Sequence, residues 1–205
     1  MTFVLNVMNR PPSIVARMAA TLQEASGGRL VLGIGIGGHP AEHAAYGVPF
    51  PASPERVARL EEAVAVLRAL WTGGPVTRAS PFYPLDEAFA FPVPSPAPPI
   101  IVGGETPAGA ALAGRIGDGW TVPAGLLREC LPVYLDALAG AGRDRSATRI
   151  LAAFDLRKDD SLAGSPWVED PAGTAARWRA AGADGAVVGA RTTGDVDLLV
   201  NAVGA

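Results

Sequence analysis

Short apolar runs alternate with segments of helical spacing along the whole chain, and this alternation limits the possible folds more than any other feature. Each run is an almost unbroken series of apolar residues, which is typical of strands buried on both faces of a parallel sheet. The six runs cover residues 2–8, 30–36, 100–102, 120–122, 150–156 and 186–188. Because a strand–helix–strand order implies a right-handed crossover, we expect a parallel α/β fold.

Helical segments lie between these runs, and two of them show their pattern most clearly. One is bounded by Pro12 and Gly27, the other by Pro54 and Gly73, which are ordinary start and stop signals. Their apolar residues recur at helical spacing as Ile14, Met18, Leu22 and Ala25 in the first, and as Val57, Leu60, Val64, Leu67 and Trp71 in the second. Further helices are expected over residues 107–117, 125–141, 171–181 and 195–203, with a kink in the second of these at Pro132.

This order of elements fits either a doubly wound sheet or a (β/α) TIM-type barrel. A complete barrel of eight strand–helix units needs about 250 residues, whereas this chain has 205. A barrel built from it has six parallel strands and lacks two units. Over residues 75–99 prolines and aromatic residues mix without helical period, so we expect an irregular excursion with a small hairpin. Length alone favours a single domain over residues 1–205.

Composition excludes several classes of protein. Apolar residues make up 49% of the chain and charged residues 18%, which indicates a large interior rather than disorder. The net charge of −3 and the lack of a Lys/Arg run argue against nucleic acid and anionic membrane surfaces as partners. No apolar stretch approaches the length of a membrane span. The two histidines and the cysteine are scattered, so we expect no metal site.

The single cysteine, Cys130, cannot form an internal disulfide. Its apolar neighbours, Leu127 and Leu131 among them, indicate a buried thiol on a helix. The start of the chain, MTFVLNVMNR, has neither a basic region nor a long apolar one, so we expect no signal peptide. Together these features favour a cytoplasmic location.

The stretch around Gly103 and Gly104 follows an apolar run and precedes an alanine-rich helix. Thr106 suits an N-cap and Pro107 suits the first helical position, which leaves N–H groups and the positive end of the helix dipole facing the turn. Such a turn binds anions, phosphate above all. A sharp structural connection explains the two glycines equally well, and the carboxylate of Glu105 competes for the same N–H groups.

Residues 33–43 hold further candidates. Gly33, Gly35 and Gly38 match G-x-G-x-x-G, but the glycines begin inside a strand and no acid-ended second strand follows, so a dinucleotide fingerprint is rejected. His39 and His43 are expected in a loop after that strand, where active sites of parallel folds lie, although an exposed loop histidine is more often a bystander. Asp155 and Arg157 end another strand and either face the same mouth or pair with each other. Asp118 is assigned to the turn, and Trp120 is assigned to the core.

Four segments taken in order resemble the bacterial luciferase-like superfamily of flavin- and coenzyme F420-dependent oxidoreductases. They are NRPPSIVARMAATLQEASGGRLVLGIGIGGHPAEHAAYGVPF, RLEEAVAVLRALW, PPIIVGGETPAGAALAGRIGDGW and GADGAVV. The resemblance extends over nearly the whole chain. It implies a (β/α) barrel that binds FMN or F420 at the carboxyl-terminal mouth, with the cofactor performing the redox step on a small-molecule substrate.

The same resemblance suggests which residues bind the cofactor. Gly103, Gly104 and Thr106 match the turn that holds its phosphate, and the loop from Gly37 through His39 to Glu42 matches the segment that flanks it. A bulge with a non-prolyl cis peptide, on which the ring rests in this family, is expected at Asn6 and Val7. Members of the family begin with two further strand–helix units that carry catalytic side chains, so here the catalytic residue stays unassigned.

Three functions are considered, of which the first two follow from this resemblance. The first is a luciferase-like oxidoreductase or monooxygenase, which with FMN can depend on a separate flavin reductase. The alternative is a non-catalytic flavin-binding or structural protein derived by loss of the N-terminal units. A weaker reading is a barrel enzyme acting on a sugar phosphate held at Gly103 and Gly104. Either the recorded start lies downstream of the true one or the chain is a natural short form. A short form leaves the strand of residues 2–8 with an unpaired edge, for which we expect a homo-oligomer.

Overall fold

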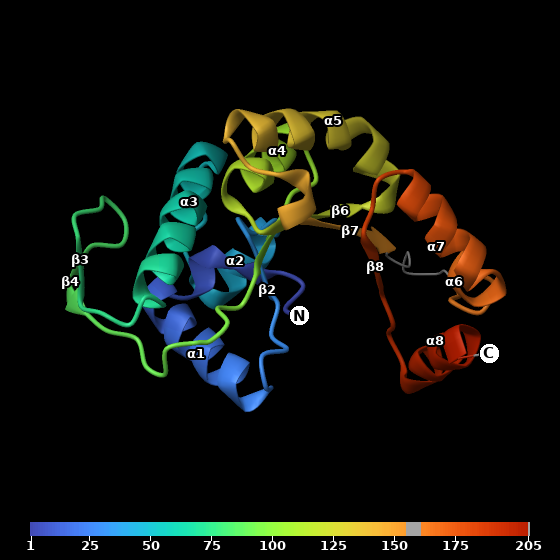
Figure 1. Cartoon of the computed structure of the whole chain (residues 1–205), viewed down its shortest axis with the longest axis horizontal. Coiled ribbons are helices and arrows are strands. Elements are labelled where there is room, and N and C mark those ends of the chain that lie inside the picture. The colour runs from blue at the N-terminus through green and yellow to red at the C-terminus, as the bar shows by residue number, and fades with distance from the viewer. Residues whose placement is uncertain (155–160, 205) are drawn as a thin grey trace. The chain divides into compact units, whose positions relative to one another are not determined.

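A computed structural model describes residues 1–154 and 161–204, and they divide into two compact units. The first consists of Met1–Gly103 with Ile116–Asp118, and the second of Gly104–Arg115 with Gly119–Ala205. Helices and strands alternate in both, as the sequence predicts (Figure 1). The predicted single domain over the whole chain stays a prediction.

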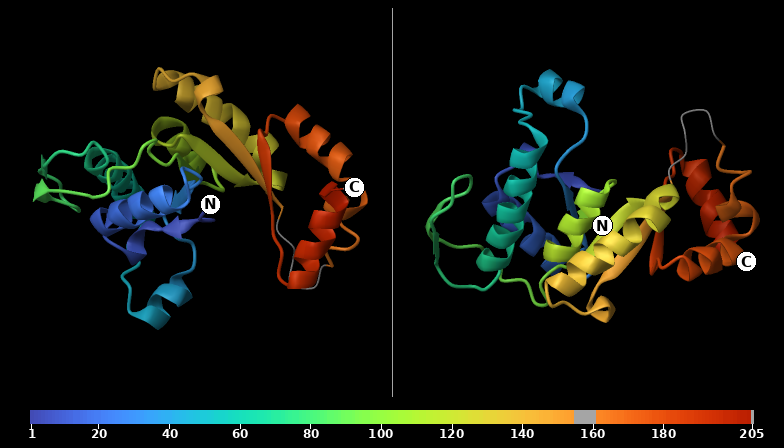
Figure 2. Two further views of the ribbon diagram at one scale, coloured as in Figure 1. Left: turned by 60° about the horizontal axis from the view of Figure 1, so that its bottom comes forward. Right: turned by 90° about the horizontal axis from the view of Figure 1, so that it is seen from above.

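Three parallel strands form the sheet of the first unit, in the order β1 (Leu5–Asn6), β2 (Leu32–Gly35) and β5 (Ile100–Gly103). Helix α1 (Pro12–Ala25) connects β1 to β2, and α3 (Ser53–Leu70) packs against it (Figure 1). Three shorter elements complete this unit: η1 (Val7–Asn9), α2 (Pro40–Tyr46) and the antiparallel hairpin of β3 (Val76–Arg78) and β4 (Leu85–Ala88). The hairpin lies within residues 75–99 and projects away from the sheet of this unit (Figure 2).

The second unit has three parallel strands of its own, in the order β6 (Gly119–Pro123), β7 (Arg149–Phe154) and β8 (Gly185–Val188). Six parallel strands are therefore present, as predicted. The helices of this unit are α4 (Pro107–Ile116, whose last residue belongs to the first unit), α5 (Ala124–Gly140), η2 (Arg145–Ala147), α6 (Pro166–Glu169), α7 (Pro171–Ala180) and α8 (Thr193–Gly204). Among the described residues no helix is long and apolar enough to cross a membrane.

The core of each unit follows the predicted apolar pattern in most places. Trp120 is fully buried and stacks on Tyr134, with ring centroids 5.1 Å apart. The Asp118 carboxylate accepts a hydrogen bond from the N–H of Ile100 and pairs with Arg68, which confirms its role in the turn. Cys130 is buried on α5, and this burial raises the pKa of its thiol.

One prediction about the first elements is wrong, and the burial along α1 differs from its apolar spacing. The strand expected over residues 2–8 is only Leu5–Asn6, because the Asn6 side chain accepts a hydrogen bond from the N–H of Met8 and the chain turns into η1. In α1 the large apolar residues are not the buried ones. Ile14, Met18 and Leu22 are about half exposed, at 46%, 45% and 52%. The buried face holds smaller side chains, such as Val15 and Ala19.

Candidate functional site

The Asn6 side chain lies where β1 ends and makes two hydrogen bonds there. Its Oδ1 accepts from the N–H of Met8 at 3.0 Å, which fixes which end of the carboxamide is the donor. Its Nδ2 lies 2.7 Å from Nε2 of His43. Val7, the other residue predicted here, is 2% exposed and belongs to the core. Asn6 therefore presents a fixed amide, whereas Val7 presents no accessible side chain.

His43 is buried rather than exposed, which corrects its predicted place in a loop. The segment after β2 forms helix α2, and the ring, 2% exposed, packs edge-on against Phe50 with centroids 4.6 Å apart. Its Nδ1 lies 3.1 Å from the carbonyl oxygen of Pro49. A carbonyl can only accept, so the network assigns the ring proton to Nδ1, and Nε2 accepts from Asn6. The histidine joins β1 to the segment that follows α2.

Arg56 of α3 also binds the segment between β2 and α3. Its Nη1 donates to the carbonyl oxygens of Gly37 at 2.6 Å and Ile36 at 3.2 Å, and its Nε donates to that of Pro51 at 3.1 Å. The guanidinium carbon lies 4.0 Å above the Phe50 ring, at cation–π distance. Sequence reasoning missed this residue, since an arginine near the start of a helix gives no sign of the carbonyls that it will meet.

Gly37 lies between these two groups, and its backbone requires glycine. Its φ is +75°, a region that L side chains rarely adopt. A Cβ atom there would also lie 2.6 Å from Nδ2 of Asn6. The structure thus brings together Gly37 and Asn6, two of the residues predicted from the family resemblance. His39 is exposed, and its carbonyl oxygen accepts from the N–H groups of Glu42 and His43 at the start of α2.

Val4 explains the glycines of the neighbouring strands. Cβ atoms built on Gly33, Gly35 and Gly103 would each lie 3.1 Å from a γ-carbon of Val4, and the one on Gly33 would first clash with the carbonyl oxygen of Thr2. These glycines leave room for a valine that is itself 37% exposed. Their spacing therefore reflects packing, in agreement with the rejected dinucleotide fingerprint.

The non-prolyl cis peptide expected at Asn6 and Val7 is found between Phe3 and Val4 instead. The position predicted from the resemblance is therefore wrong by three residues. Gly103 takes part in this arrangement by leaving space for Val4 rather than for a ligand directly.

In the second unit, the turn after Gly103 has the predicted geometry. Pro107 is the first residue of α4, and Oγ1 of Thr106 accepts from the N–H of Gly109 at 3.1 Å, which makes Thr106 an N-cap. The N–H of Gly104 donates to Thr121, and its carbonyl oxygen accepts from Nε1 of Trp120 at 3.0 Å. A Cβ on Gly104 would lie 2.6 Å from the carbonyl carbon of Gly109, so this glycine allows the turn to approach the helix closely.

The first turn of α4 is exposed from residue 105 to residue 108. An exposed, capped helix start offers backbone donors to an anion. Asp155 and Arg157, predicted to face the site, lie outside the described residues. Among the residues that the structure describes, no group of three or more His, Cys, Asp or Glu side chains could hold a metal ion.

Comparisons with known proteins agree on one family. The family model described as luciferase-like monooxygenase matches residues 1–162. An F420-dependent glucose-6-phosphate dehydrogenase of Microbacterium testaceum is 35% identical over 139 residues, covering 65% of this chain and 41% of that protein. An F420-dependent hydroxymycolic acid dehydrogenase of Mycobacterium tuberculosis is 36% identical over 135 residues, covering 65% and 37%. The chain thus spans about two fifths of the length of these relatives.

Solved structures give the fold. An F420-dependent secondary alcohol dehydrogenase matches with a TM-score of 0.79 at 23% identity, over 98% of this chain and 77% of that one. The monooxygenase RslO1 from Streptomyces bottropensis matches with a TM-score of 0.61 at 26% identity, over 97% and 59%.

Proposed function

Because the chain belongs to the luciferase-like monooxygenase family, whose model matches residues 1–162, we propose that it acts as an oxidoreductase with F420 or FMN as cofactor. The family match is the observation that carries this proposal. The fold is the (β/α) barrel type of that family, of which six parallel strands are present. The alternative of a non-catalytic binding or structural protein is not favoured.

The residues of the first unit suit the cofactor ring. Val4 presents a partly exposed apolar surface beside the carboxyl ends of β2 and β5. Gly37 lies beside the fixed amide of Asn6, and Arg56 holds the carbonyl oxygens of Ile36 and Gly37 in place. A rigid apolar platform flanked by ordered backbone groups is the usual environment of a flat, hydrogen-bonding ring. We propose that Val4 and Gly37 contact the cofactor ring and that Asn6 and His39 lie beside it.

The helix start that follows Gly103 and Gly104 suits a phosphate group. Pro107 has no N–H and the N–H groups of Gly109 and Ala110 donate to Thr106, so the backbone donors at this exposed helix start are those of residues 105, 106 and 108, beside the positive end of the helix dipole. When F420 is bound it supplies hydride transfer, and reduced FMN supplies reaction with oxygen. The protein's own part is to bind the phosphate at this turn and to orient the ring.

The substrate that we propose is an alcohol. Two curated relatives and one solved structure are named as F420-dependent dehydrogenases, the last of them as a secondary alcohol dehydrogenase. These names favour F420 over FMN and hydride removal from a carbon that bears a hydroxyl group. With F420 as cofactor no flavin reductase is needed. We also propose a cytoplasmic location, in line with the buried thiol of Cys130.

A titration followed by a turnover assay tests this proposal. Purified protein is titrated with F420 and, in parallel, with FMN, and binding is followed by the change in cofactor fluorescence. We expect F420 to bind more tightly. Reduction of F420 is then measured with secondary alcohols and with glucose 6-phosphate. Failure to bind either cofactor contradicts the proposal, and binding without reduction by any alcohol supports the non-catalytic alternative.

A further inference from the structure

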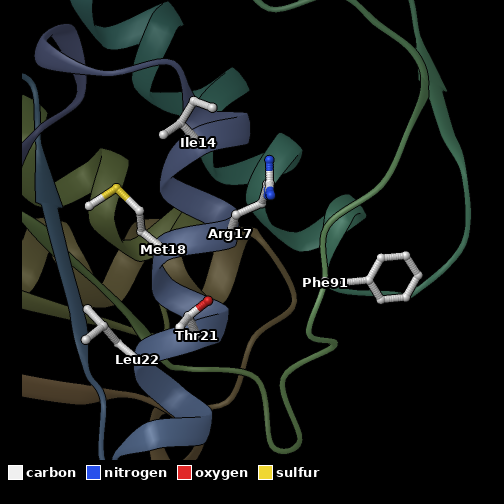
Figure 3. Close-up of a pocket in the computed structure, with 6 residues that line it drawn as sticks. All are labelled: Ile14, Arg17, Met18, Thr21, Leu22 and Phe91. Atoms are coloured by element: carbon white, nitrogen blue, oxygen red, sulfur yellow. The ribbon is translucent and has the colours of Figure 1, made fainter.

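Helix α1 exposes an apolar stripe that its own unit does not cover. Ile14, Met18 and Leu22 follow one another at helical spacing and lie along one side of the helix (Figure 3). With Arg17, Thr21 and Phe91 they line a groove of about 460 Å³. Side chains of this size are usually buried, and contiguous exposed apolar surface marks an interaction site. Arg17 is the charged residue of the groove.

Helix α8, in the second unit, has a second stripe of this kind. None of its residues is buried. Val196, Val200 and Val203 recur at helical spacing and are 50%, 64% and 71% exposed. Asp195 and Asp197 lie beside this stripe, and the helix contains no Lys or Arg. Its apolar face is therefore bordered by negative charge, whereas the groove on α1 contains a positive one.

The strands that precede these two helices also lack a neighbour on one edge. Within the described residues, β1 pairs with β2 on one side in the first unit, and β8 pairs with β7 on one side in the second. An unpaired strand edge is a ready template for another chain. The strands of the second unit run in the order β6, β7, β8, and those of the first unit in the order β1, β2, β5. If β1 of one copy lay next to β8 of another, neighbouring strands would again follow each other in this order along a shared sheet.

We propose that the occupant of the α1 groove is α8 of a second copy of this chain. In parallel β/α folds, helices that follow neighbouring strands pack against each other on one face of the sheet. The β8–α8 unit of one copy takes the place beside the β1–α1 unit of the next. Valines of α8 fill the groove, Arg17 faces Asp197, and both strand edges become paired. Each copy uses two different surfaces, so the assembly is head-to-tail and closes as a ring or extends.

Two single variants test this arrangement by light scattering coupled to size exclusion. Met18→Glu places a charge in the groove, and Val200→Glu places one on the stripe of α8. Both positions are exposed, so the variants are expected to fold, which circular dichroism checks. Since a charge at the centre of an apolar contact weakens binding by about thirtyfold or more, each variant alone should be monomeric where the wild-type protein is oligomeric. Ala139→Glu, at an exposed position of α5, is the matched control and should leave the assembly unchanged.

Mixing the two variants gives the sharper result. Met18→Glu retains an intact α8, and Val200→Glu retains an intact groove, so an equimolar mixture should form a heterodimer with one native interface. A symmetric interface built from the same surface on both copies predicts no rescue. The paired reversal Arg17→Asp with Asp197→Arg should restore association that Arg17→Asp alone weakens.

Some outcomes overturn the proposal. A wild-type protein that is monomeric at every concentration shows that α8 does not bind a second copy, whether it packs within its own chain or stays exposed. An oligomer that persists in both variants places the interface elsewhere. No cofactor is needed in these measurements, so their failure is distinct from a failure of the proposed oxidoreductase function.

Discussion

The carboxamide of Asn6 donates a hydrogen bond to the ring of His43 across 2.7 Å, and this contact joins the end of β1 to helix α2. The ring of His43 in turn donates from Nδ1 to the carbonyl oxygen of Pro49, and Arg56 donates to the carbonyl oxygens of Ile36 and Gly37. The segment between β2 and α3 is therefore tied at both ends. Buried hydrogen-bond networks of this type rigidify a segment when every member has its partner. The proposed ring-binding segment is held by side chains that need not touch the cofactor.

Gly37→Ala tests this network at the close contact between Gly37 and Asn6. A Cβ there meets the Asn6 amide at 2.6 Å, and the φ of +75° is unfavourable for alanine. We expect the free energy of unfolding to fall by at least about 2 kcal/mol, measured by urea denaturation. Gly47→Ala is the matched control, because Gly47 has a φ of +65° with nothing within 4 Å of its Cβ position, and it should cost about 1 kcal/mol. Equal losses in the two variants would show that Asn6 does not restrict Gly37.

Arg56→Met removes the donors that hold the same segment. Hydrogen bonds from a charged donor contribute about 1.5–3 kcal/mol each and are not additive, so we expect a loss of about 2–4 kcal/mol in the free energy of unfolding. Arg56→Lys should recover part of it, since one ammonium cannot reach all three carbonyls in the same geometry. Hydrogen exchange of residues 36–51, followed by mass spectrometry, should rise in Arg56→Met. Unchanged exchange there would show that Arg56 does not hold this segment. Arg128→Met, at an exposed position of α5, is the control.

Local signals in the sequence predicted the elements well where a single segment decides the outcome. Thr106 and Pro107 mark the start of α4 because capping depends on residues close together in the chain. The burial of Leu60 and Leu67 followed from helical spacing along α3. Such patterns predict the type of an element more reliably than its ends, which is why β1 proved shorter than expected.

The residues whose surroundings the sequence did not predict depend on distant partners. Met18 carries the periodicity of a core helix, yet it is exposed because smaller residues such as Val15 and Ala19 form the buried face of α1. His43 is buried because Phe50, seven residues later, folds back on its ring. The glycines of β2 leave space for Val4 and, at Gly33, for the carbonyl oxygen of Thr2, and both of these residues precede β1. No local pattern contains this information, since each contact is made only when the chain folds.

Asp170 should make the free energy of unfolding of the second unit depend on pH. Its carboxylate accepts from the N–H of Gly173 at 2.9 Å and pairs with Arg177 at 3.1 Å, and these contacts, the backbone hydrogen bond first, hold its pKa below the usual 3.8. A lowered pKa in the folded state means that the contribution is present above about pH 4 and is lost as the pH falls through the folded pKa. Asp170→Asn keeps an acceptor for Gly173 but removes the charge.

The difference in urea midpoint between wild type and Asp170→Asn should therefore be largest near neutral pH and shrink below pH 3.8. Asp136→Asn, at an exposed position of α5, is the matched control. A difference that does not change between pH 7 and pH 3 would show that the charge of Asp170 contributes nothing to folding.

Gly104→Ala separates the packing role of the turn from its proposed role in binding phosphate. The added Cβ would lie 2.6 Å from the backbone of Gly109, so the turn must move away from α4, at a cost of about 1–3 kcal/mol in the free energy of unfolding. Gly125→Ala on α5, with nothing within 4 Å of its Cβ position, should instead stabilise the protein by about 0.5–1 kcal/mol.

If the first turn of α4 holds the cofactor phosphate, Gly104→Ala should also weaken F420 binding at least tenfold at temperatures where the variant is fully folded. Thr106→Ala should weaken it less, because the cap fixes the helix start without occupying the turn. Binding of F420 that is unchanged in folded Gly104→Ala places the phosphate elsewhere, and the turn is then a structural connection alone.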